Sequence, residues 1–321
     1  MKKTPKILVV GSYMMDLVAS TRRAPKEGET VIGMKFNMAP GGKGNNQAVQ
    51  CARLGAQVTM VGQVGADAFG QKLLDGAAQA GVDISHVLTD PDEATGIAHI
   101  TLEVSEHDAR NRITVCPGAN FTLIPEKIGW LKDAVGDYDL VMMQLELPMD
   151  VVEAVAQWAK QAGVPVMLNP APAAPLSDRL LSCVTYLSPN EHEAAEMAGR
   201  PLPTQDGVRD EDLQAVGNYF LDKGVENVLI TLGGNGSALI RRDGVLRVRS
   251  VHVDPVVDTT AAGDSFVAAF CTALTGGDDP RQALTFASHT AALTVSRMGA
   301  MPSLPTLAEV EQMMEERKAS F

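Results

Sequence analysis

The sequence predicts an α/β protein, a three-layer sandwich in which helices cover both faces of a mostly parallel central sheet. Three observations predict this class. Short apolar runs alternate with longer helical patterns along most of the 321 residues. Hydrophobic residues make up 45% and charged residues 21% of the chain, enough to build a large core. No repeat, low-complexity tract or long linker divides the sequence, so we expect a single domain over residues 1–321.

Six short apolar runs are the expected strands of the central sheet, because β-branched and aliphatic residues dominate them. In chain order they are Ile7–Val10, Val58–Val64, Leu140–Leu145, Val164–Leu168, Thr185–Ser188 and Val228–Leu232. The segment Arg242-Asp-Gly-Val245 has the composition of a hairpin turn, so antiparallel pairing is expected late in the sheet. The β-branched run Val251–Val257 is interpreted as the end of a further strand.

Eight stretches have a helical pattern and separate or follow these strands. They are Gly44–Leu54, Gln71–Ala80, Asp150–Gln161, Glu191–Ala198, Asp212–Lys223, Gly263–Leu274, Arg281–Ser296 and Thr306–Lys318. The alternation of strands and helices is interrupted in two stretches, Leu17–Met38 and Thr95–Val115. Each has an alternating, more polar strand pattern and contains no predicted helix. We expect them to form a small sheet beside the main body.

Charge and composition exclude several classes of partner. The formal net charge of −12 argues against a surface for nucleic acid or anionic membranes, which needs clustered Lys and Arg. No apolar run approaches the ~20 residues that span a bilayer. The N-terminal run Ile7–Val10 is too short for a signal peptide. The four cysteines show no CxxC pair and the six histidines no metal spacing, so we expect a cytoplasmic protein without a disulfide framework or zinc site.

The segment Asp258-Thr-Thr-Ala-Ala-Gly-Asp264 lies directly before an apolar predicted helix. Its small residues let a phosphate approach the backbone, and the N–H groups that open a helix attract anions. Asp264 stands on the first turn, where its carboxylate can take a proton from a hydroxyl held beside that anion. This layout suits phosphoryl transfer to an alcohol. By itself, the segment is equally compatible with an Asp that caps a helix after a Gly-containing turn.

A second segment, Ala39-Pro-Gly-Gly-Lys-Gly-Asn-Asn-Gln-Ala48, opens the first predicted helix, which stops at Gly55. Its three glycines allow a ligand to approach the backbone closely. Lys43, Asn45 and Asn46 supply hydrogen-bond donors, and the two amides can also accept. This combination suits a polyhydroxylated ligand.

Together the two segments resemble the paired signatures of the ribokinase-like carbohydrate kinases, one near each end of the chain. Further motifs follow in the order that ribokinases show: Gly11-Ser12 with Asp16, Gln144-Leu-Glu146, Asn169-Pro-Ala-Pro172, Asn190-Glu-His-Glu193, Thr231-Leu-Gly233 and Gly299 to Ser303. The resemblance covers essentially the whole chain. It implies the ribokinase-like sandwich, in which the small sheet, about residues 17–38 and 95–115, is a lid over the sugar and a homodimer interface.

The resemblance implies an ATP- and magnesium-dependent kinase acting on the 5-hydroxyl of ribose or 2-deoxyribose. Asp264 would be the catalytic base, and the N–H groups of Ala261, Ala262 and Gly263 the anion hole; positioning and electrostatics carry most of such catalysis. The implied ATP-binding residues are Asn190, Thr231, Gly233, Gly236, Gly263 and Ser288, with Glu193 ordering magnesium through water. Without the resemblance, Asn190 to Glu193 is also a capping box, and Thr231 to Gly236 a turn.

A monovalent-cation site is also implied by the resemblance. Asp258 and Thr260 match part of it, and oxygen atoms of Thr294, Arg297, Gly299 and Ser303 would complete it. Ligation by oxygen alone suits a hard cation such as potassium. Gly299 is equally explained as a C-terminal helix cap.

The positions that match sugar contacts in the family are Met14, Asp16, Gly42, Lys43, Asn46 and Glu146, with Asp264 facing the reacting hydroxyl. Met14 departs from ribokinases, which carry Asn there. A thioether cannot usefully bond a hydroxyl, whereas an amide can. The same Met is typical of deoxyribokinases, so 2-deoxyribose is favoured over ribose. The alternative, that Met14 packs in the core of an enzyme that accepts ribose, stays open.

Competing functions share the fold or the phosphate chemistry. Nucleoside, fructose or ketodeoxygluconate kinases would use the same anion hole and base. A catalytically inactive sugar-binding regulator would keep the fold, but the intact Asp264 argues against it. A Rossmann oxidoreductase lacks its fingerprint, because the first strand ends in Gly11-Ser-Tyr-Met-Met-Asp16. Gly65-Ala-Asp-Ala-Phe-Gly70 has Walker spacing without the following Lys-Ser/Thr and is interpreted as an ordinary loop.

Overall fold

A nine-stranded sheet forms the centre of the computed structural model, which describes residues 2–104, 109–203 and 208–318. The strand order is β13-β12-β11-β10-β9-β8-β1-β4-β5. Neighbouring strands are parallel from β11 to β5, and the β11–β12 and β12–β13 pairs are antiparallel. The expected mostly parallel sheet and its late hairpin at Arg242-Asp-Gly-Val245 are confirmed.

The elements follow the predicted alternation closely. The strands of the large sheet are β1 (Lys6–Val10), β4 (Gln57–Gly65), β5 (Val82–Asp90), β8 (Leu140–Met143), β9 (Val166–Leu168), β10 (Tyr186–Leu187), β11 (Asn227–Thr231), β12 (Ser237–Arg241) and β13 (Gly244–Val248). The helices are α1 (Lys43–Arg53), α2 (Ala68–Gln79), α3 (Leu131–Ala134), α4 (Met149–Ala162), α5 (Asp178–Leu181), α6 (Glu191–Ala198), α7 (Asp210–Leu221), α8 (Ala262–Thr275), α9 (Pro280–Val295) and α10 (Leu307–Lys318). Each expected helix is present, with ends within three residues of those predicted.

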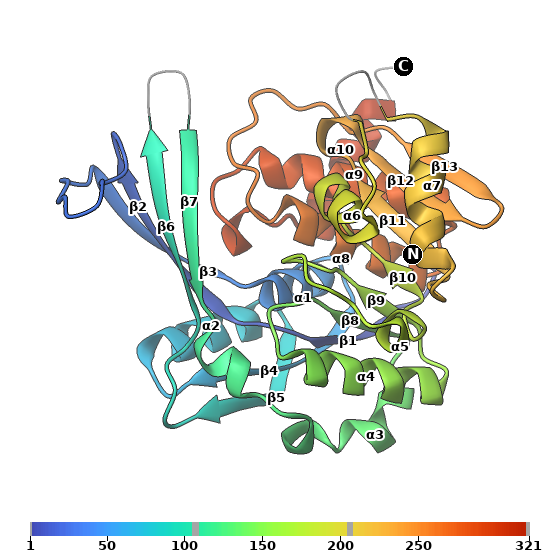
Figure 1. Ribbon diagram of the computed structural model, residues 1–321, viewed down its shortest axis with the longest axis horizontal. Helices are drawn as coiled ribbons and strands as arrows, with labels where there is room; N and C mark the ends of the chain where they lie inside the picture. The colour runs from blue at the N-terminus through green and yellow to red at the C-terminus, as the bar shows by residue number, and fades with distance from the viewer. Residues whose placement is uncertain (1, 105–108, 204–207, 319–321) are drawn as a thin grey trace.

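Alternate residues of the central strands feed two separate cores, because successive side chains of a strand point to opposite faces. In β1, Leu8 and Val10 belong to a cluster shared with helices α3 to α7. Ile7 and Val9 belong to a second cluster shared with α1, α2, α8, α9 and α10. All four side chains are fully buried, which explains why β1 has an uninterrupted apolar sequence. The three-layer arrangement can be followed in Figure 1.

The small sheet stands beside the main body, at the left of Figure 1. Its strands, in the order β3-β2-β6-β7, are β2 (Met14–Thr21), β3 (Lys35–Gly41), β6 (Ile97–Val104) and β7 (Ala109–Cys116). The sheet was expected from Leu17 to Met38, but its first ladder reaches Met14, which pairs with Gly41. Met14 and Met15 are almost completely buried at the foot of the sheet, so the polar pattern that marks the outer strands is missing there.

Three expectations about local structure were wrong or incomplete. Val251–Val257 forms no strand, and Pro255 within it cannot donate to a ladder. Strand β5 was not predicted, because it is an edge strand whose side chains are mostly half-buried or exposed. The loop expected at Gly65–Gly70 ends early, because Asp67 caps α2 by accepting from the Gly70 N–H at 2.8 Å. Within the described ranges, no helix is long and apolar enough to cross a bilayer.

Candidate active site

The candidate site lies where the beginnings of α1 and α8 meet the foot of the small sheet. The N-terminal residues of α1 follow β3 directly, and Asp16 comes from β2. Glu146 follows β8, which pairs with β1 in the middle of the large sheet. In parallel sheets ligands bind beyond the carboxyl ends of the strands, where such loops converge. Residues from both ends of the chain therefore share one site.

The first turn of α8 has the geometry of an anion site. Ala261, its N-cap, has φ of 60° and is the one non-glycine residue with positive φ in the described part of the chain. Left-handed backbone at a residue with a Cβ costs about 1–2 kcal/mol, so the surrounding structure must hold this turn. A Cβ built on Gly263 meets nothing within 4 Å, which leaves room for a ligand against the helix N-terminus. The Ala262 N–H, expected in the anion hole, donates to the Thr259 carbonyl at 3.2 Å.

Asp264 is buried at the start of α8, and both of its carboxylate oxygens accept from amides of α1. Asn46 Nδ2 donates to Oδ2 at 2.9 Å, and Gln47 Nε2 donates to Oδ1 at 3.1 Å. The structure therefore brings together Asn46 and Asp264, two residues predicted to lie around the sugar. Gln47 was not among the predicted site residues. The signal for it was available, since Asn45-Asn46-Gln47 and Gln50 place four amides on a helix that is buried on that side.

The glycines before α1 are required by close contacts. Gly42 has φ of 89°, and a Cβ there would lie 2.7 Å from the Met14 backbone nitrogen. A Cβ on Gly41 would lie 2.5 Å from Asp16 Oδ2, so the Asp16 carboxylate rests directly on this backbone. The close approach brings β2, β3 and the start of α1 together. It also places Lys43 at the first position of the helix, beside the acidic groups of the site.

Glu146 connects the loop after β1 with the start of α1. Its Oε2 accepts from the Ser12 hydroxyl at 2.5 Å and from the Lys43 backbone N–H at 2.9 Å. Burial raises the pKa of Glu146 in spite of these bonds and of the Lys43 charge. Burial alone would lower the pKa of Lys43, but the surrounding carboxylates, Asp264 first, outweigh burial and raise it.

Asp16 is the most perturbed carboxyl group of the site. Burial, followed by the charges of Glu146, Asp264 and Asp258, raises its pKa from 3.8 to about 7, with Lys43 acting in the opposite direction. Four carboxylates influence the single ammonium group of Lys43, so negative charge is in excess. An excess of this kind suits a site that accepts hydrogen bonds from sugar hydroxyls and costs stability when no ligand is bound.

Asp16→Asn is expected to stabilise the free protein above neutral pH. Because folding raises the pKa of Asp16, the native state keeps its proton between about pH 4 and pH 7, whereas the unfolded chain loses it. The stability of the wild type therefore falls as the pH rises through this window. The variant carries no such charge. Its advantage in free energy of unfolding should grow by about 2–3 kcal/mol between pH 5 and pH 8. Urea unfolding at both pH values measures it, and an advantage independent of pH would contradict the assignment.

Met14 shares one face of β2 with Asp16, because the two residues are two positions apart. It is 2% exposed, yet it belongs to neither of the two core clusters of the described residues. Its neighbours Tyr13 and Met15 both belong to the second cluster. The burial of Met14 is therefore at the foot of the small sheet, beside the start of α1, and not in the main core.

A cavity of about 240 Å³ adjoins Asp264. It is lined by Lys43, Asn169, Ala171, Ser188, Asn190, Glu193, Thr231, Thr259, Ala261, Ala262, Gly263, Asp264 and Val267. The structure thus brings together most of the residues predicted for ATP and the anion hole. The lining does not include Gly233, Gly236 or Ser288, and the Ser288 hydroxyl donates to the Leu284 carbonyl within its own helix at 2.9 Å.

Asn190 and Glu193 form the capping box that the sequence analysis described as the alternative to nucleotide binding. Asn190 Oδ1 accepts from the Glu193 N–H at 2.8 Å, and Glu193 Oε2 accepts from the Asn190 N–H at 2.9 Å. Both residues also line the cavity. Capping does not exclude a ligand role, because the capping bond uses Glu193 Oε2 and a carboxylate has a second oxygen that can accept. Burial raises the pKa of the Glu193 carboxyl.

Three of the six predicted cation residues, Asp258, Thr260 and Gly299, contact one another beside the start of α8. Asp258 Oδ1 accepts from the Thr260 N–H and hydroxyl at 2.9 and 2.6 Å, and Asp258 Oδ2 accepts from the Gly299 N–H at 2.9 Å. Asp258 therefore ties the loop before α8 to the turn that follows α9. The Ser303 hydroxyl donates to the Ala300 carbonyl, and the Thr294 hydroxyl to Ser265 and the Thr290 carbonyl.

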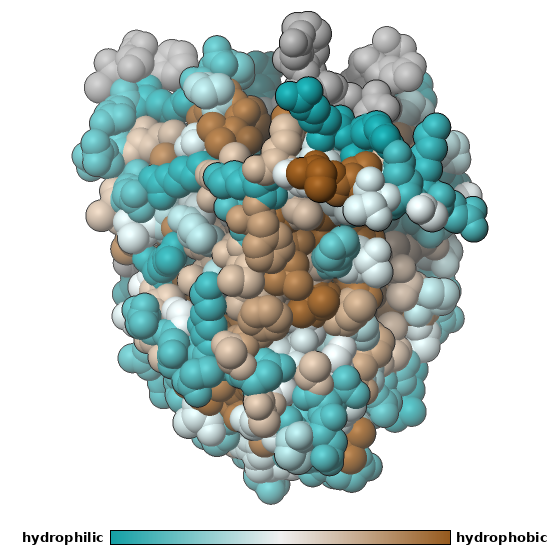
Figure 2. Space-filling model, turned by 90° about the vertical axis from the view of Figure 1, so that its left-hand side faces the viewer, coloured by the Kyte–Doolittle hydropathy of each residue, from teal (hydrophilic) through white to brown (hydrophobic). Residues whose placement is uncertain are grey.

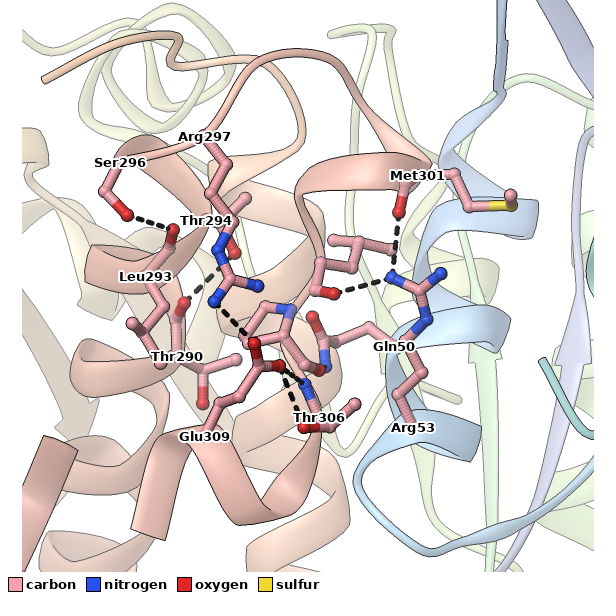
Figure 3. Close-up of polar contacts among 12 residues, drawn as sticks. Gln50, Arg53, Thr290, Leu293, Thr294, Ser296, Arg297, Met301, Thr306 and Glu309 are labelled. Atoms are coloured by element: carbon pink, nitrogen blue, oxygen red, sulfur yellow. Dashed lines mark hydrogen bonds and ion pairs between the residues drawn. The ribbon is translucent and has the colours of Figure 1, made fainter. Parts of the chain in front are cut away.

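Figure 3 shows how this turn is anchored from both sides. From α1, Arg53 donates to the carbonyls of Met301 and Leu304 at 3.0 and 2.6 Å, and Gln50 to that of Pro305 at 2.9 Å. From the other side, Arg297 pairs with Glu309 at 2.7 Å. The helix that binds Asp264 at its beginning thus holds the 299–305 turn at its end.

The family assignment rests on a match over nearly the whole chain. The protein-family model described as "pfkB family carbohydrate kinase" matches residues 4–307 of the sequence. The chain belongs to the pfkB family of carbohydrate kinases. The resemblance inferred from its motifs is confirmed, and the protein is a kinase.

Individual relatives of this pfkB family member point to the ribokinase type. The ribokinase of Haemophilus influenzae is 38% identical over 315 residues, which cover 98% of this chain and 99% of that protein. The deoxyribokinase of Salmonella typhimurium is 33% identical over 307 residues, covering 95% and 97%. The solved structure of Arabidopsis thaliana ribokinase complexed with ribose and ATP matches with a TM-score of 0.87 at 33% identity, covering 97% of this chain and 99% of that one. The ribokinase-like fold is therefore confirmed.

Proposed function

We propose that this kinase transfers the γ-phosphoryl group of ATP to the 5-hydroxyl of a pentose, with 2-deoxyribose preferred over ribose. The observation that carries the proposal is the position of Asp264: it lies at the N-terminus of α8, its carboxylate is oriented by two amides, and it faces the cavity beside Lys43. A base and an anion site on one helical turn are the two parts that phosphoryl transfer to an alcohol requires.

In this mechanism Asp264 accepts the proton of the 5-hydroxyl as the oxygen attacks the γ-phosphorus. The transferred group carries negative charge that the free N–H groups of the first α8 turn and Lys43 stabilise. Asp16 and Glu146 accept from other sugar hydroxyls and orient the ring, and Asn46 can bond both the sugar and Asp264. Asn190, Thr231 and Glu193 line the side of the cavity proposed for the nucleotide.

The choice of sugar rests on Met14 and on the relatives. Relatives named ribokinase and deoxyribokinase both match almost the full chain, so a pentose is the shared expectation. Met14 favours the sugar that lacks the 2-hydroxyl. A coupled kinase assay over ribose, 2-deoxyribose, nucleosides and hexoses tests the proposal. A hexose or nucleoside with a higher kcat/KM than both pentoses would refute it.

Magnesium fits the residues on the nucleotide side. Glu193 offers one partly buried carboxylate oxygen toward the cavity, and Mg²⁺ commonly binds through one or two carboxylates, several waters and substrate phosphates. When bound, the ion would neutralise charge on the phosphate oxygens. Glu193 would orient it through water, held in place by its capping bond to Asn190.

Potassium fits the Asp258 loop, where the Gly299 N–H bond brings the turn after α9 beside the start of α8. We propose that Asp258 and carbonyl or hydroxyl oxygens of Thr260, Thr294, Arg297, Gly299 and Ser303 hold a monovalent cation. Such an ion would order the anion hole without touching the sugar. Its hard oxygen ligands suit potassium.

Exchanging sodium chloride for potassium chloride at constant ionic strength is therefore expected to raise kcat. The ion would be bound only by fixed oxygens, so the gain should saturate and should be absent in lithium or sodium. Asp258→Asn should weaken the response by removing the one charged ligand. An identical kcat in lithium, sodium and potassium chloride of equal ionic strength would refute the proposed cation site.

The small sheet is proposed as a lid over the sugar and as the interface of a homodimer within a single kinase domain. Met34, Phe36 and Met38 are 52%, 59% and 46% exposed, on or next to β3. A cavity of about 480 Å³, lined in part by Phe69, Ile97 and Cys116, adjoins the foot of the same sheet. Figure 2 shows the hydrophobic band on this side of the molecule. Exposed apolar patches of this kind mark interaction surfaces.

Phe36→Glu is expected to convert the proposed dimer to a monomer, because a charge would be buried in the apolar interface. Sedimentation equilibrium measures the mass directly. Asn37→Asp adds one negative charge at the next position, which points to the opposite face of the strand, and should leave the dimer intact. A monomeric wild type would refute the interface.

A further inference from the structure

A chain of buried amides leads from Gln144, directly after β8, to the Asp264 carboxylate. Gln144 Nε2 donates to Gln47 Oε1 at 2.6 Å, and Gln47 Nε2 donates to Asp264 Oδ1 at 3.1 Å and to Asn169 Oδ1 at 3.2 Å. Gln47 and Gln144 are fully buried or nearly so, at 0% and 1% exposure. Both polar atoms of the Gln47 amide are hydrogen-bonded, whereas Gln144 Oε1 is buried without a partner among the described residues. Because buried amides are usually hydrogen-bonded, the bonded geometry of Gln47 is informative.

The neighbours of Gln47 permit one orientation of its amide. Asn169 Nδ2 donates to the Ser188 carbonyl at 2.8 Å, which turns the Asn169 oxygen toward Gln47. If the Gln47 amide were reversed, its oxygen would face two further acceptors, those of Asp264 and Asn169. The side chain must therefore present its donors to Asp264.

The backbone at Gly11 makes room for the other end of this chain. A Cβ on Gly11 would lie 2.4 Å from Gln144 Oε1, so a larger residue would displace the Gln144 amide. Gln144 thus depends on the end of β1, and Gln47 depends on Gln144. Each oxygen of Asp264 receives one amide donor, from Asn46 and Gln47, which fixes the rotation of a carboxylate whose terminal torsion is otherwise broad.

We propose that Gln47 is the positioning residue of the catalytic base: it fixes the Asp264 carboxylate and keeps it ready to accept the hydroxyl proton, while Gln144 acts through Gln47. This inference rests on the proposed role of Asp264. The amides suit the task because they carry no titratable proton, so they donate to the carboxylate at every pH. A Lys or His in their place would compete for the transferred proton.

Gln47→Leu is expected to lower kcat by about 10- to 100-fold, the usual effect of losing one hydrogen bond to a charged group. The KM values for sugar and ATP should change less than about threefold, because Gln47 is fully buried and does not line the cavity beside Asp264. The acidic limb of the kcat profile should move to higher pH, since the ionised carboxylate has lost a donor. A kcat within threefold of wild type with an unmoved limb would overturn the proposal.

Gln144→Leu tests the relay and keeps the proposal testable if Gln47→Leu does not fold. Alone, it should lower kcat by about 3- to 10-fold and move the same limb in the same direction. When Gln144→Leu is added to Gln47→Leu, kcat should fall no further, because Gln144 acts on Asp264 only through Gln47. Equal costs in both backgrounds, or an unmoved limb in the single variant, would show that Gln144 does not act on Asp264.

Gln50→Leu is the matched control, since Gln50 is a buried amide on the same helix and its Nε2 donates to the Pro305 carbonyl. Figure 3 shows Gln50 beside the turn that contains Met301. It should lower the thermal midpoint to a similar degree without moving the acidic limb. A moved limb in this variant would mean that any loss in α1 disturbs the base, and would overturn the specific role of Gln47. An active Asp264→Asn variant would instead show that Asp264 is not the catalytic base. This result distinguishes failure of the proposed function from failure of the proposed role of Gln47.

Discussion

Asp264→Asn is expected to lower kcat by roughly 10²–10⁴, the range typical for loss of a general base. The substitution keeps the shape of the side chain and removes its proton acceptor. It also leaves one oxygen where the carboxylate had two, so either Asn46 or Gln47 loses its acceptor. That buried donor should cost about 1–3 kcal/mol of stability. Fold and ATP binding should survive, because the backbone at the start of α8 is unchanged.

Turnover, ATP affinity and thermal unfolding should be measured together on this variant. Asp279→Asn is a suitable control, since Asp279 caps α9 by accepting from the Gln282 N–H and Asn is an equally good cap. It should retain full turnover. An Asp264→Asn enzyme with more than a third of wild-type turnover on its best sugar would show that another group takes the proton.

Met14→Asn is expected to shift the preference from 2-deoxyribose toward ribose. If the buried thioether faces the position of the 2-hydroxyl, ribose binds to wild type with that hydroxyl unpaired. The penalty is about 1–3 kcal/mol, or some 5- to 150-fold in kcat/KM. Asn would supply the missing partner for ribose and leave an amide unpaired when 2-deoxyribose binds, so the ratio should narrow or reverse. The KM for ATP should hardly change.

The ratio of kcat/KM for the two sugars is the measurement. Met15→Leu provides the control, because Met15 is the next residue on the strand and packs in the core cluster on the opposite face. Its volume-conserving change should alter stability by less than about 1.5 kcal/mol and leave the ratio alone. A wild type that prefers ribose, or an unchanged ratio in Met14→Asn, would return Met14 to a packing role.

Local sequence patterns predicted the large sheet and its helices because each element is specified by its own residues. The apolar run of β1 is buried on both faces, and α6 begins and ends where Asn190 and Gly199 place its caps. The motifs around Gly42 and Asp264 were recognisable for a similar reason. Close backbone contacts and a free helix N-terminus require small residues at fixed spacing, and this requirement is visible in a single sequence.

The sequence did not predict how most strands pair, because pairing depends on a partner strand from elsewhere in the chain. Val251–Val257 has the composition of a strand, but it pairs with no strand of either sheet. Met14 was recognised as a departure from ribokinases, yet only the pairing of Met14 with Gly41 shows that it stands on the small sheet. Pairing is decided by which edges are free after folding, and local propensity cannot report that.

The site, like the fold, was determined in part by the sequence and in part by the tertiary structure. The sequence by itself determined the fold class, the family resemblance and the residues proposed for catalysis, because these depend on residue type and spacing. Only the tertiary structure shows that Gln144 donates to Gln47 and Gln47 to Asp264, and that burial among carboxylates raises the pKa of Asp16 to about 7. Gln47 and Asp264 are separated by 217 positions in the chain, and both effects arise from contacts between side chains that only folding brings together.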